Sequence, residues 1–90
     1  RDLIDGDFHA MKGCEIDPTA VITGKSSLGA NVRVGAGVKI EDCIIGDGVT
    51  IGDGAELSHC FIFHGTQVAP GRCESRQYLS NSLSVSINLP

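Results

Sequence analysis

A period of about six residues runs through the middle of this 90-residue chain and constrains its fold more than any other feature. Ten aliphatic residues recur at this spacing: Ile16, Ile22, Leu28, Val34, Ile40, Ile45, Ile51, Leu57, Ile62 and Val68. Repeats of this length are typical of parallel β-helices, in which each unit forms one side of a triangular coil. The sequence therefore predicts an all-β solenoid with the aliphatic side chains inside and the residues between them facing water.

Two of the steps, Ile40 to Ile45 and Leu57 to Ile62, are five residues long instead of six. They recur at equivalent places in successive coils, so each later coil is expected to be one residue shorter than three full units. Neighbouring strands lie about 4.8 Å apart, so residues one coil apart should be close neighbours. The expected columns at the corners are Gly37, Gly54 and Gly71, and Asn31, Gly48 and Gly65. The expected stacked pairs are Ile44 with Phe61, Ile45 with Ile62, and Cys43 with Cys60.

The composition limits the classes of molecule that this chain is expected to bind. The formal net charge is −4 and there is no basic cluster, which argues against nucleic acid and against an anionic membrane surface. No apolar run approaches the length of a membrane span, and no signal peptide is recognised. The four cysteines lack CxxC spacing, so we expect reduced thiols in a cytoplasmic protein without a cofactor. A disulfide between Cys43 and Cys60 is the alternative.

The two ends of the chain lack the repeat. Residues 1–13 are expected to be a cap or a linker, in which a few apolar residues have roughly helical spacing: Leu3, Ile4, Phe8 and Met11. Residues 73–90 contain four apolar residues that alternate with polar ones: Leu83, Val85, Ile87 and Leu89. This alternation indicates a half-buried strand, which either caps the last coil or pairs with another subunit.

Residues 14–72 resemble the hexapeptide-repeat superfamily. The resemblance implies a left-handed parallel β-helix, here of about three coils, although parallel crossovers are normally right-handed. Within that superfamily, Ile40–Gly52 (IEDCIIGDGVTIG) and Cys60–Gly71 (CFIFHGTQVAPG) resemble the β-helical tails of sugar-phosphate nucleotidyltransferases, especially of the mannose-1-phosphate guanylyltransferase type. Those enzymes catalyse on a separate α/β domain with a Gly-rich loop, which nothing in residues 1–39 matches. The resemblance implies a non-catalytic assembly or regulatory module, whose partners are further copies of itself or the catalytic domain of a parent enzyme.

His59 and His64 are the candidate catalytic or metal-binding residues. The shortened register places His59 over Asp42 and His64 over Asp47. A carboxylate beside an imidazole favours the charged form of the imidazole. In the simplest interpretation these are two exposed stacked pairs, each contributing at most about 1 kcal/mol.

The alternative is a small trimeric hexapeptide-repeat enzyme that uses His59 or His64 at a subunit interface. The spacing of the two histidines resembles the paired ligands of γ-class carbonic anhydrases, which would make His59, His64 and Asp42 candidate metal ligands. That family needs a third histidine from a neighbouring coil, and the stacked positions here are not histidine. In an acyltransferase one histidine would act as general base, but the repeat contains no extruded loop between Ile16 and Val68.

Overall fold

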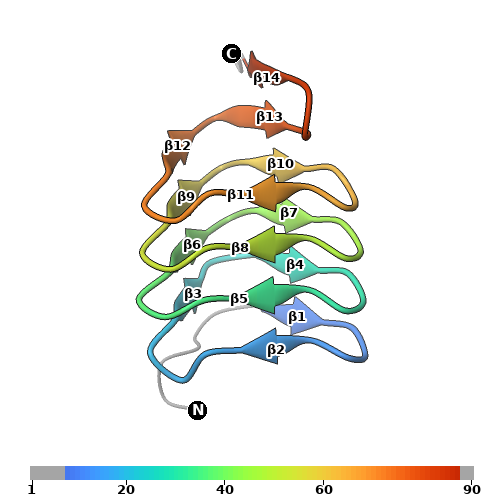
Figure 1. Cartoon of the computed structure of the whole chain (residues 1–90), viewed down its shortest axis with the longest axis vertical. Helices are drawn as coiled ribbons and strands as arrows, with labels where there is room; N and C mark the ends of the chain where they lie inside the picture. The colour runs from blue at the N-terminus through green and yellow to red at the C-terminus, as the bar shows by residue number, and fades with distance from the viewer. Residues whose placement is uncertain (1–7, 88–90) are drawn as a thin grey trace.

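The computed structural model describes residues 8–87, in which 14 short strands and the turns between them wind into a left-handed parallel β-helix (Figure 1). The chain makes about four turns, one more than the repeat predicts. The extra turn arises because β1 (His9–Ala10) precedes the repeat, while β12 (Cys73–Ser75) and β13 (Gln77–Leu79) continue the coil after it. Within this part of the chain there is no helix that could span a membrane.

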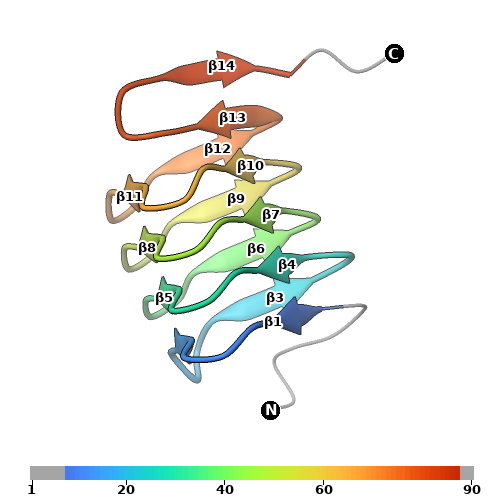
Figure 2. The same ribbon diagram turned by 90° about the vertical axis from the view of Figure 1, so that its right-hand side faces the viewer.

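The strands form three sheets, one on each side of the prism. Sheet A contains β3 (Val21–Thr23), β6 (Lys39–Glu41), β9 (Glu56–Ser58) and β12. Sheet C contains β2 (Glu15–Ile16), β5 (Arg33–Val34), β8 (Thr50–Ile51) and β11 (Gln67–Val68). Sheet B contains β1, β4 (Ser27–Leu28), β7 (Ile44–Ile45), β10 (Phe61–Ile62), β13 and β14 (Ser84–Ser86). Figure 2 shows the stacked coils from the side, with β14 as the last strand at the C-terminal end.

The register expected from the two short steps is confirmed. Ile16 pairs with Val34 in a coil of three full units, whereas the later strands pair one residue closer along the chain, as in Ile45 with Ile62. The corner columns adopt the left-handed backbone conformation, with φ of 69°, 76° and 75° at Gly37, Gly54 and Gly71. In the other column Asn31, Gly48 and Gly65 have φ of 60°, 68° and 70°.

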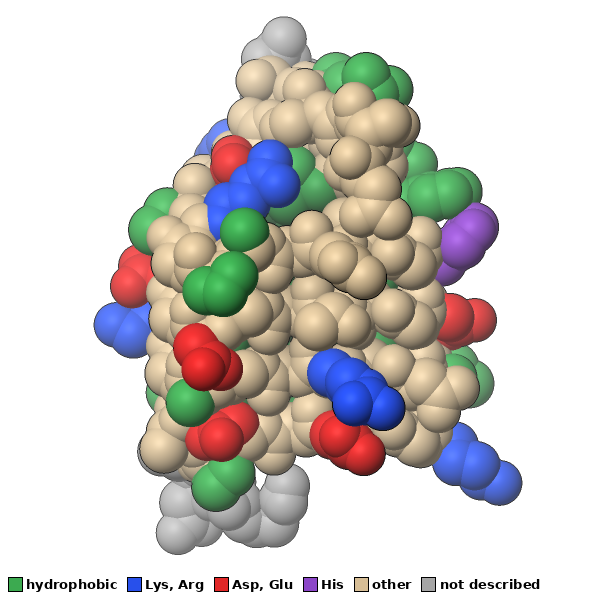
Figure 3. All heavy atoms as spheres, in the orientation of Figure 1, with side chains coloured by type: hydrophobic (Ala, Val, Ile, Leu, Met, Phe, Trp, Pro, Cys, Tyr) green, Lys and Arg blue, Asp and Glu red, His purple; other side chains and the backbone are tan. Residues whose placement is uncertain are grey.

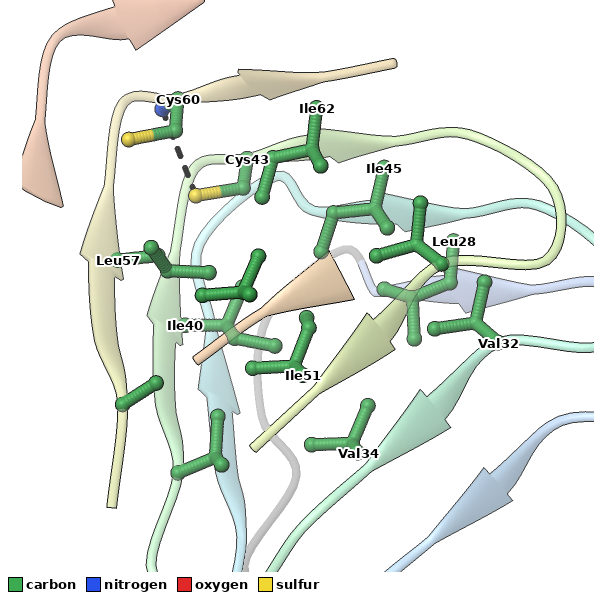
Figure 4. Packing of buried hydrophobic residues seen from close by; sticks show 14 of the residues in the cluster. Leu28, Val32, Val34, Ile40, Cys43, Ile45, Ile51, Leu57, Cys60 and Ile62 are labelled. Carbon is green, nitrogen blue, oxygen red and sulfur yellow. Dashed lines mark hydrogen bonds between the residues drawn. The ribbon is translucent and has the colours of Figure 1, made fainter. Parts of the chain in front are cut away.

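The repeated aliphatic residues fill the interior of the prism (Figure 4). Nine of the ten are at most 4 % exposed, and Ile16 in the first coil is partly buried against them. The position four residues later sits inside a corner, where Val38 and Ala55 are also buried. Burial of these side chains provides the apolar contribution that stabilises a coil this narrow.

After Leu28 and Val34 a small residue is required because the next coil places a carboxylate there. A Cβ atom on Gly35 would collide with the side chain of Asp53. The Oδ1 atom of Asp53 accepts a hydrogen bond from the backbone N–H of Ala36 at 2.9 Å. Asp47 makes the same bond to Ala30, also at 2.9 Å. The Gly-Asp-Gly segments therefore connect successive coils at their corners.

At the N-terminal end, Phe8 packs against the core and residues 9–10 form β1. The helical spacing of the apolar residues does not produce a helix among the described residues of this segment, and Met11 is 65 % exposed. Leu3 and Ile4 lie outside the described residues. Parallel pairing of β1 with β4 extends sheet B instead.

At the C-terminal end, two charged residues occupy positions that are apolar in the coils before. Glu74 pairs in register with Leu57, and Arg72 follows Ala55 in its column. Their side chains form an ion pair with 2.8 Å between Nε and Oε2, and both are only partly exposed. A further coil would have to bury both charges, which is costly. The pair therefore ends two of the buried columns, while Leu79 in β13 remains the last buried core residue of sheet B.

The predicted strand near the C-terminus forms as β14, which pairs antiparallel with β13 and so joins the last coil. The expectation that it is half-buried is wrong. All three of its residues are exposed, and Val85 and Leu83 retain 48 % and 61 % of their accessible surface. Alternation alone does not tell which face of a strand turns inward, and here the apolar face turns outward. Leu89 lies outside the described residues.

Candidate interaction surface

The outer face of sheet C is polar. Its central column consists of Glu15, Arg33, Thr50 and Gln67, which pair in register from coil to coil. Arg33 and Glu15 form an exposed ion pair at 3.8 Å. Figure 3, in which this sheet lies in front, shows acidic and basic side chains scattered over an otherwise uncharged surface.

Sheet A is also mostly polar on its outer face. Lys39 pairs in register with Glu56, and Glu41 with Ser58. An open hollow of ≈ 530 Å³ lies over this face, and its lining includes Lys39, Glu41 and Glu56. The mixed charges and the open shape do not point to one class of ligand.

Sheet B differs from the other two because the outer face of its later strands, from β7 onward, is apolar. Four side chains from β7, β10 and β13 and the turn after β10 form what we call the aromatic face: Ile44, Phe61, Phe63 and Tyr78. Ile44, Phe61 and Phe63 are 50 %, 45 % and 42 % exposed. Large apolar side chains that gather on one face of a small protein mark a surface of interaction.

The rings of the aromatic face contact one another. The ring centroids of Phe61 and Tyr78 lie 5.7 Å apart, and those of Phe63 and Tyr78 lie 6.3 Å apart. Both pairs are tilted, at separations that are favourable for aromatic side chains. Because Phe61 and Tyr78 sit on strands paired in register, the fold holds their rings side by side, and Phe63 in the following turn adds a third ring.

The position of these residues in the repeat explains why they face outward. Ile44, Phe61 and Tyr78 each directly precede an inward-pointing aliphatic residue, one in each successive coil. In β4, one coil before β7, Ser27 occupies this position. The register predicted from the sequence stacks Ile44 on Phe61, but it did not reveal an exposed apolar surface. An apolar residue before the aliphatic, recurring once per coil, is the signal that could have revealed it.

The expected pairing of His59 with Asp42 is present. His59 Nε2 lies 3.4 Å from Asp42 Oδ2, and the two side chains are 44 % and 36 % exposed. The other carboxylate oxygen of Asp42 accepts a hydrogen bond from the backbone N–H of Lys25 at 2.8 Å. Both residues adopt the left-handed backbone conformation at the shortened corner. The main role of Asp42 is therefore to link two coils through this hydrogen bond.

His64 lies over Asp47 in the backbone register, but no ion pair joins them among the described residues. The carboxylate of Asp47 turns toward the preceding coil, where it binds Ala30. The imidazole of His64 instead lies against Phe63, with ring centroids 4.0 Å apart. His64 thus borders the aromatic face, and the two histidines stand at different corners of the prism.

Cys43 and Cys60 stack at one corner as expected, and both are free thiols. The backbone N–H of Cys60 donates to Cys43 Sγ at 3.5 Å (Figure 4). Contact with the Cys60 sulfur, together with burial, raises the pKa of Cys43. A raised pKa is typical of a thiol that serves packing, whereas the contact with Cys43 lowers the pKa of Cys60 to about 6.

Within residues 8–87 no three His, Cys, Asp or Glu side chains are grouped closely enough to hold a metal ion. The enzymatic roles considered for His59, His64 and Asp42 stay predictions. The aromatic face is a surface that the sequence did not predict.

Comparison with known protein families gives one match that covers most of the chain. Residues 4–73 match the family described as the GMPPB C-terminal domain. The match begins before the repeat and ends at β12, so it includes Ile44 of β7 and Phe61 of β10.

Proposed function

Because the chain belongs to the GMPPB C-terminal domain family, we propose that it is a non-catalytic assembly and regulatory module of a sugar-phosphate nucleotidyltransferase of the mannose-1-phosphate guanylyltransferase type. In this role the β-helix binds other parts of the enzyme and leaves nucleotidyl transfer to a separate catalytic domain. The four free cysteines support a cytoplasmic location.

The observation that carries this proposal is that, among the described strands, the large apolar side chains that are exposed lie on one of the three sheets. The aromatic face offers rigid rings at low entropic cost, as the centres of protein interfaces do. The other two sheets carry charges of both signs, whereas this face has none among its four members. We assign the catalytic domain of the parent enzyme as the partner that covers it.

A binding experiment tests this assignment. The 90-residue chain is mixed with the catalytic domain of a mannose-1-phosphate guanylyltransferase from which the tail has been removed, and the complex is detected by light scattering on a sizing column. Phe61→Ser combined with Phe63→Ser should weaken binding by about tenfold or more. Thr50→Ser, on the polar face of sheet C, should leave it unchanged.

Equal binding by the Phe61 and Phe63 variant and by the Thr50 variant would contradict the assignment of the aromatic face. A separate assay addresses catalysis. The isolated chain is incubated with GTP, mannose 1-phosphate and Mg²⁺, and no GDP-mannose should form. Turnover by the chain alone would overturn the non-catalytic role.

A further inference from the structure

In the strands of the repeat the aliphatic residue points inward, whereas the apolar residue of β14 points outward. Its apolar residue Val85 lies opposite Tyr78, and directly opposed residues share one side of an antiparallel sheet. Val85 therefore points to the outer side of sheet B, where it is 48 % exposed. The serines point to the other side, where the Gln77 side chain holds them both, at 3.0 Å from Ser84 Oγ and 3.1 Å from Ser86 Oγ.

The hydrogen bonds to β13 show which backbone groups of β14 remain free. The N–H of Ile87 donates to Arg76, and the carbonyl of Leu83 accepts from Ser80, both at 2.8 Å. Because the bonds of an antiparallel ladder alternate along each strand, the N–H and C=O groups of Ser84 and Ser86 point away from β13. Among the described residues no strand pairs with the other side of β14, so these groups form an open edge there.

This edge lacks the features that usually protect edge strands. Residues 77–87 contain no charged residue and no proline. Exposed edges are commonly blocked by lysine, by proline or by inward-pointing charges. The first coil at the opposite end of the prism does carry such residues, in Lys12, Glu15, Asp17 and Pro18.

The absence of charge also indicates which partner the edge accepts. Each chain carries a net charge of −4, so two copies repel one another through most of their surface. The segment around β14 is neutral, so two copies can meet there without that repulsion. The protected N-terminal coil disfavours head-to-tail stacking, which would otherwise generate open filaments.

We propose that β14 pairs antiparallel with β14 of a second copy, in a register centred on Val85. In this register Ser84 lies opposite Ser86 of the partner subunit, and the free backbone groups of both residues are satisfied. The two Val85 side chains then lie opposite one another on the outer side of the joined sheets. The column of Ile44, Phe61, Tyr78 and Val85 continues across the two-fold axis into the partner. This inference rests on the proposed function, since it names a partner for the assembly role.

Charge substitutions at Val85 test the pairing. The mass of the 90-residue chain in solution is measured by light scattering over a series of concentrations, and a dimer is expected at high concentration. Val85→Lys and Val85→Glu, each alone, should be monomeric because like charges would lie directly opposite one another. An equimolar mixture of the two variants should recover the dimer. Met11→Lys, an exposed substitution at the other end of the prism, should not affect it.

A second variant tests the backbone bonds without adding charge. Ser86→Pro removes an N–H that points to the open edge, so it should abolish the dimer while leaving the pairing with β13 intact. The circular dichroism spectrum and the unfolding midpoint of the monomeric variants should match those of the parent chain. A monomer at every concentration up to about 1 mM, a trimer, or a dimer unchanged by both Val85→Lys and Ser86→Pro would overturn the inference.

The same variants separate this inference from the proposed function. If the chain dimerises through Val85 but does not bind the catalytic domain, the proposed function fails and the pairing of β14 stands. If the catalytic domain binds through Phe61 and Phe63 while the chain stays monomeric, the pairing of β14 fails and the proposed function stands.

Discussion

The backbone N–H of Cys60 donates to Cys43 Sγ over 3.5 Å, and the Cys43 thiol in turn donates to the carbonyl of Glu41 over 3.3 Å. In the preceding coil Ser26 has the same arrangement. Its hydroxyl accepts from the N–H of Cys43 at 3.2 Å and donates to the carbonyl of Thr23 at 3.0 Å. This corner of the prism therefore requires a small side chain that can both accept and donate.

The first prediction follows from that requirement. Cys43→Ala leaves the buried N–H of Cys60 without a partner and should lower the free energy of unfolding by about 1–3 kcal/mol. Cys43→Ser keeps both bonds, as Ser26 does, and should cost clearly less. Urea unfolding of the two variants measures the difference. A serine variant that is no more stable than the alanine variant would show that volume, not hydrogen bonding, governs this position.

The second prediction concerns the direction of neighbouring side chains in β8. Ile51 is 1 % exposed, whereas Thr50 faces solvent between Arg33 and Gln67. Ile51→Asp places an unpaired charge inside the prism and should destabilise the fold by at least about 3 kcal/mol. Thr50→Asp should change the free energy of unfolding by no more than about 0.5 kcal/mol. Thermal unfolding followed by circular dichroism compares them, and similar losses would mean that the register is incorrect.

The third prediction addresses the carboxylate that joins two coils. Asp53→Ala removes the acceptor for the N–H of Ala36 and should cost about 1–2 kcal/mol. Asp53→Asn retains an oxygen at the same place and should cost less. Amide hydrogen exchange gives a local measurement, because the Ala36 amide should exchange faster in the alanine variant. Unchanged protection at Ala36 would argue against the bond.

The fourth prediction concerns pH. Asp17 Oδ1 accepts hydrogen bonds from Thr19 Oγ1 at 2.6 Å and from the backbone N–H of Thr19 at 2.8 Å, and these bonds lower the pKa of Asp17 from its usual value. A carboxyl whose pKa is lowered by folding stabilises the native state above its unfolded pKa, and the stabilisation disappears as the pH falls through the folded pKa. Thr19→Val removes the hydroxyl bond, which is the larger cause, and should raise the pKa of Asp17. Titration of the Asp17 carboxyl by NMR measures the change, and an unaltered pKa would rule out this cause.

The fifth prediction concerns the histidines. The double variant His59→Ala, His64→Ala loses one exposed ion pair at 3.4 Å and one contact with Phe63. Because exposed ion pairs contribute little, the double variant should stay folded and lose no more than about 1–2 kcal/mol. Unfolding in urea and mass in solution check both parts. Collapse of the fold would mean that these side chains have a larger structural role than their exposure indicates.

The period of the aliphatic residues was enough to predict the coil, its register and its corner columns. Each of those follows from spacing alone, as the pairing of Ile45 with Ile62 and the left-handed backbone at Gly48 show. The extra turn was not predicted because β1 and β13 lie outside the repeat and are added by pairing with β4 and β10.

The candidate site was predicted only in part, because it depends on side-chain direction. His59 meets Asp42 as the register requires, but the carboxylate of Asp47 turns to the preceding coil, and His64 lies against Phe63 instead. Alternation in residues 83–87 correctly indicated a strand but not which face is exposed. That choice follows from the hairpin between β13 and β14, which sets Val85 opposite Tyr78.

The charged pair of Arg72 and Glu74 ends two buried columns at the C-terminal end only, and each coil in the middle of the prism contacts just its two neighbours. A duplicated coil inserted between Ile45 and Ile62 would therefore find the same neighbours above and below, and both ends would remain as they are. Each such insertion would move β14 about 4.8 Å further from the N-terminal coil. The module can thus act as a spacer whose length changes in fixed increments during evolution, without any redesign of the surfaces at its ends.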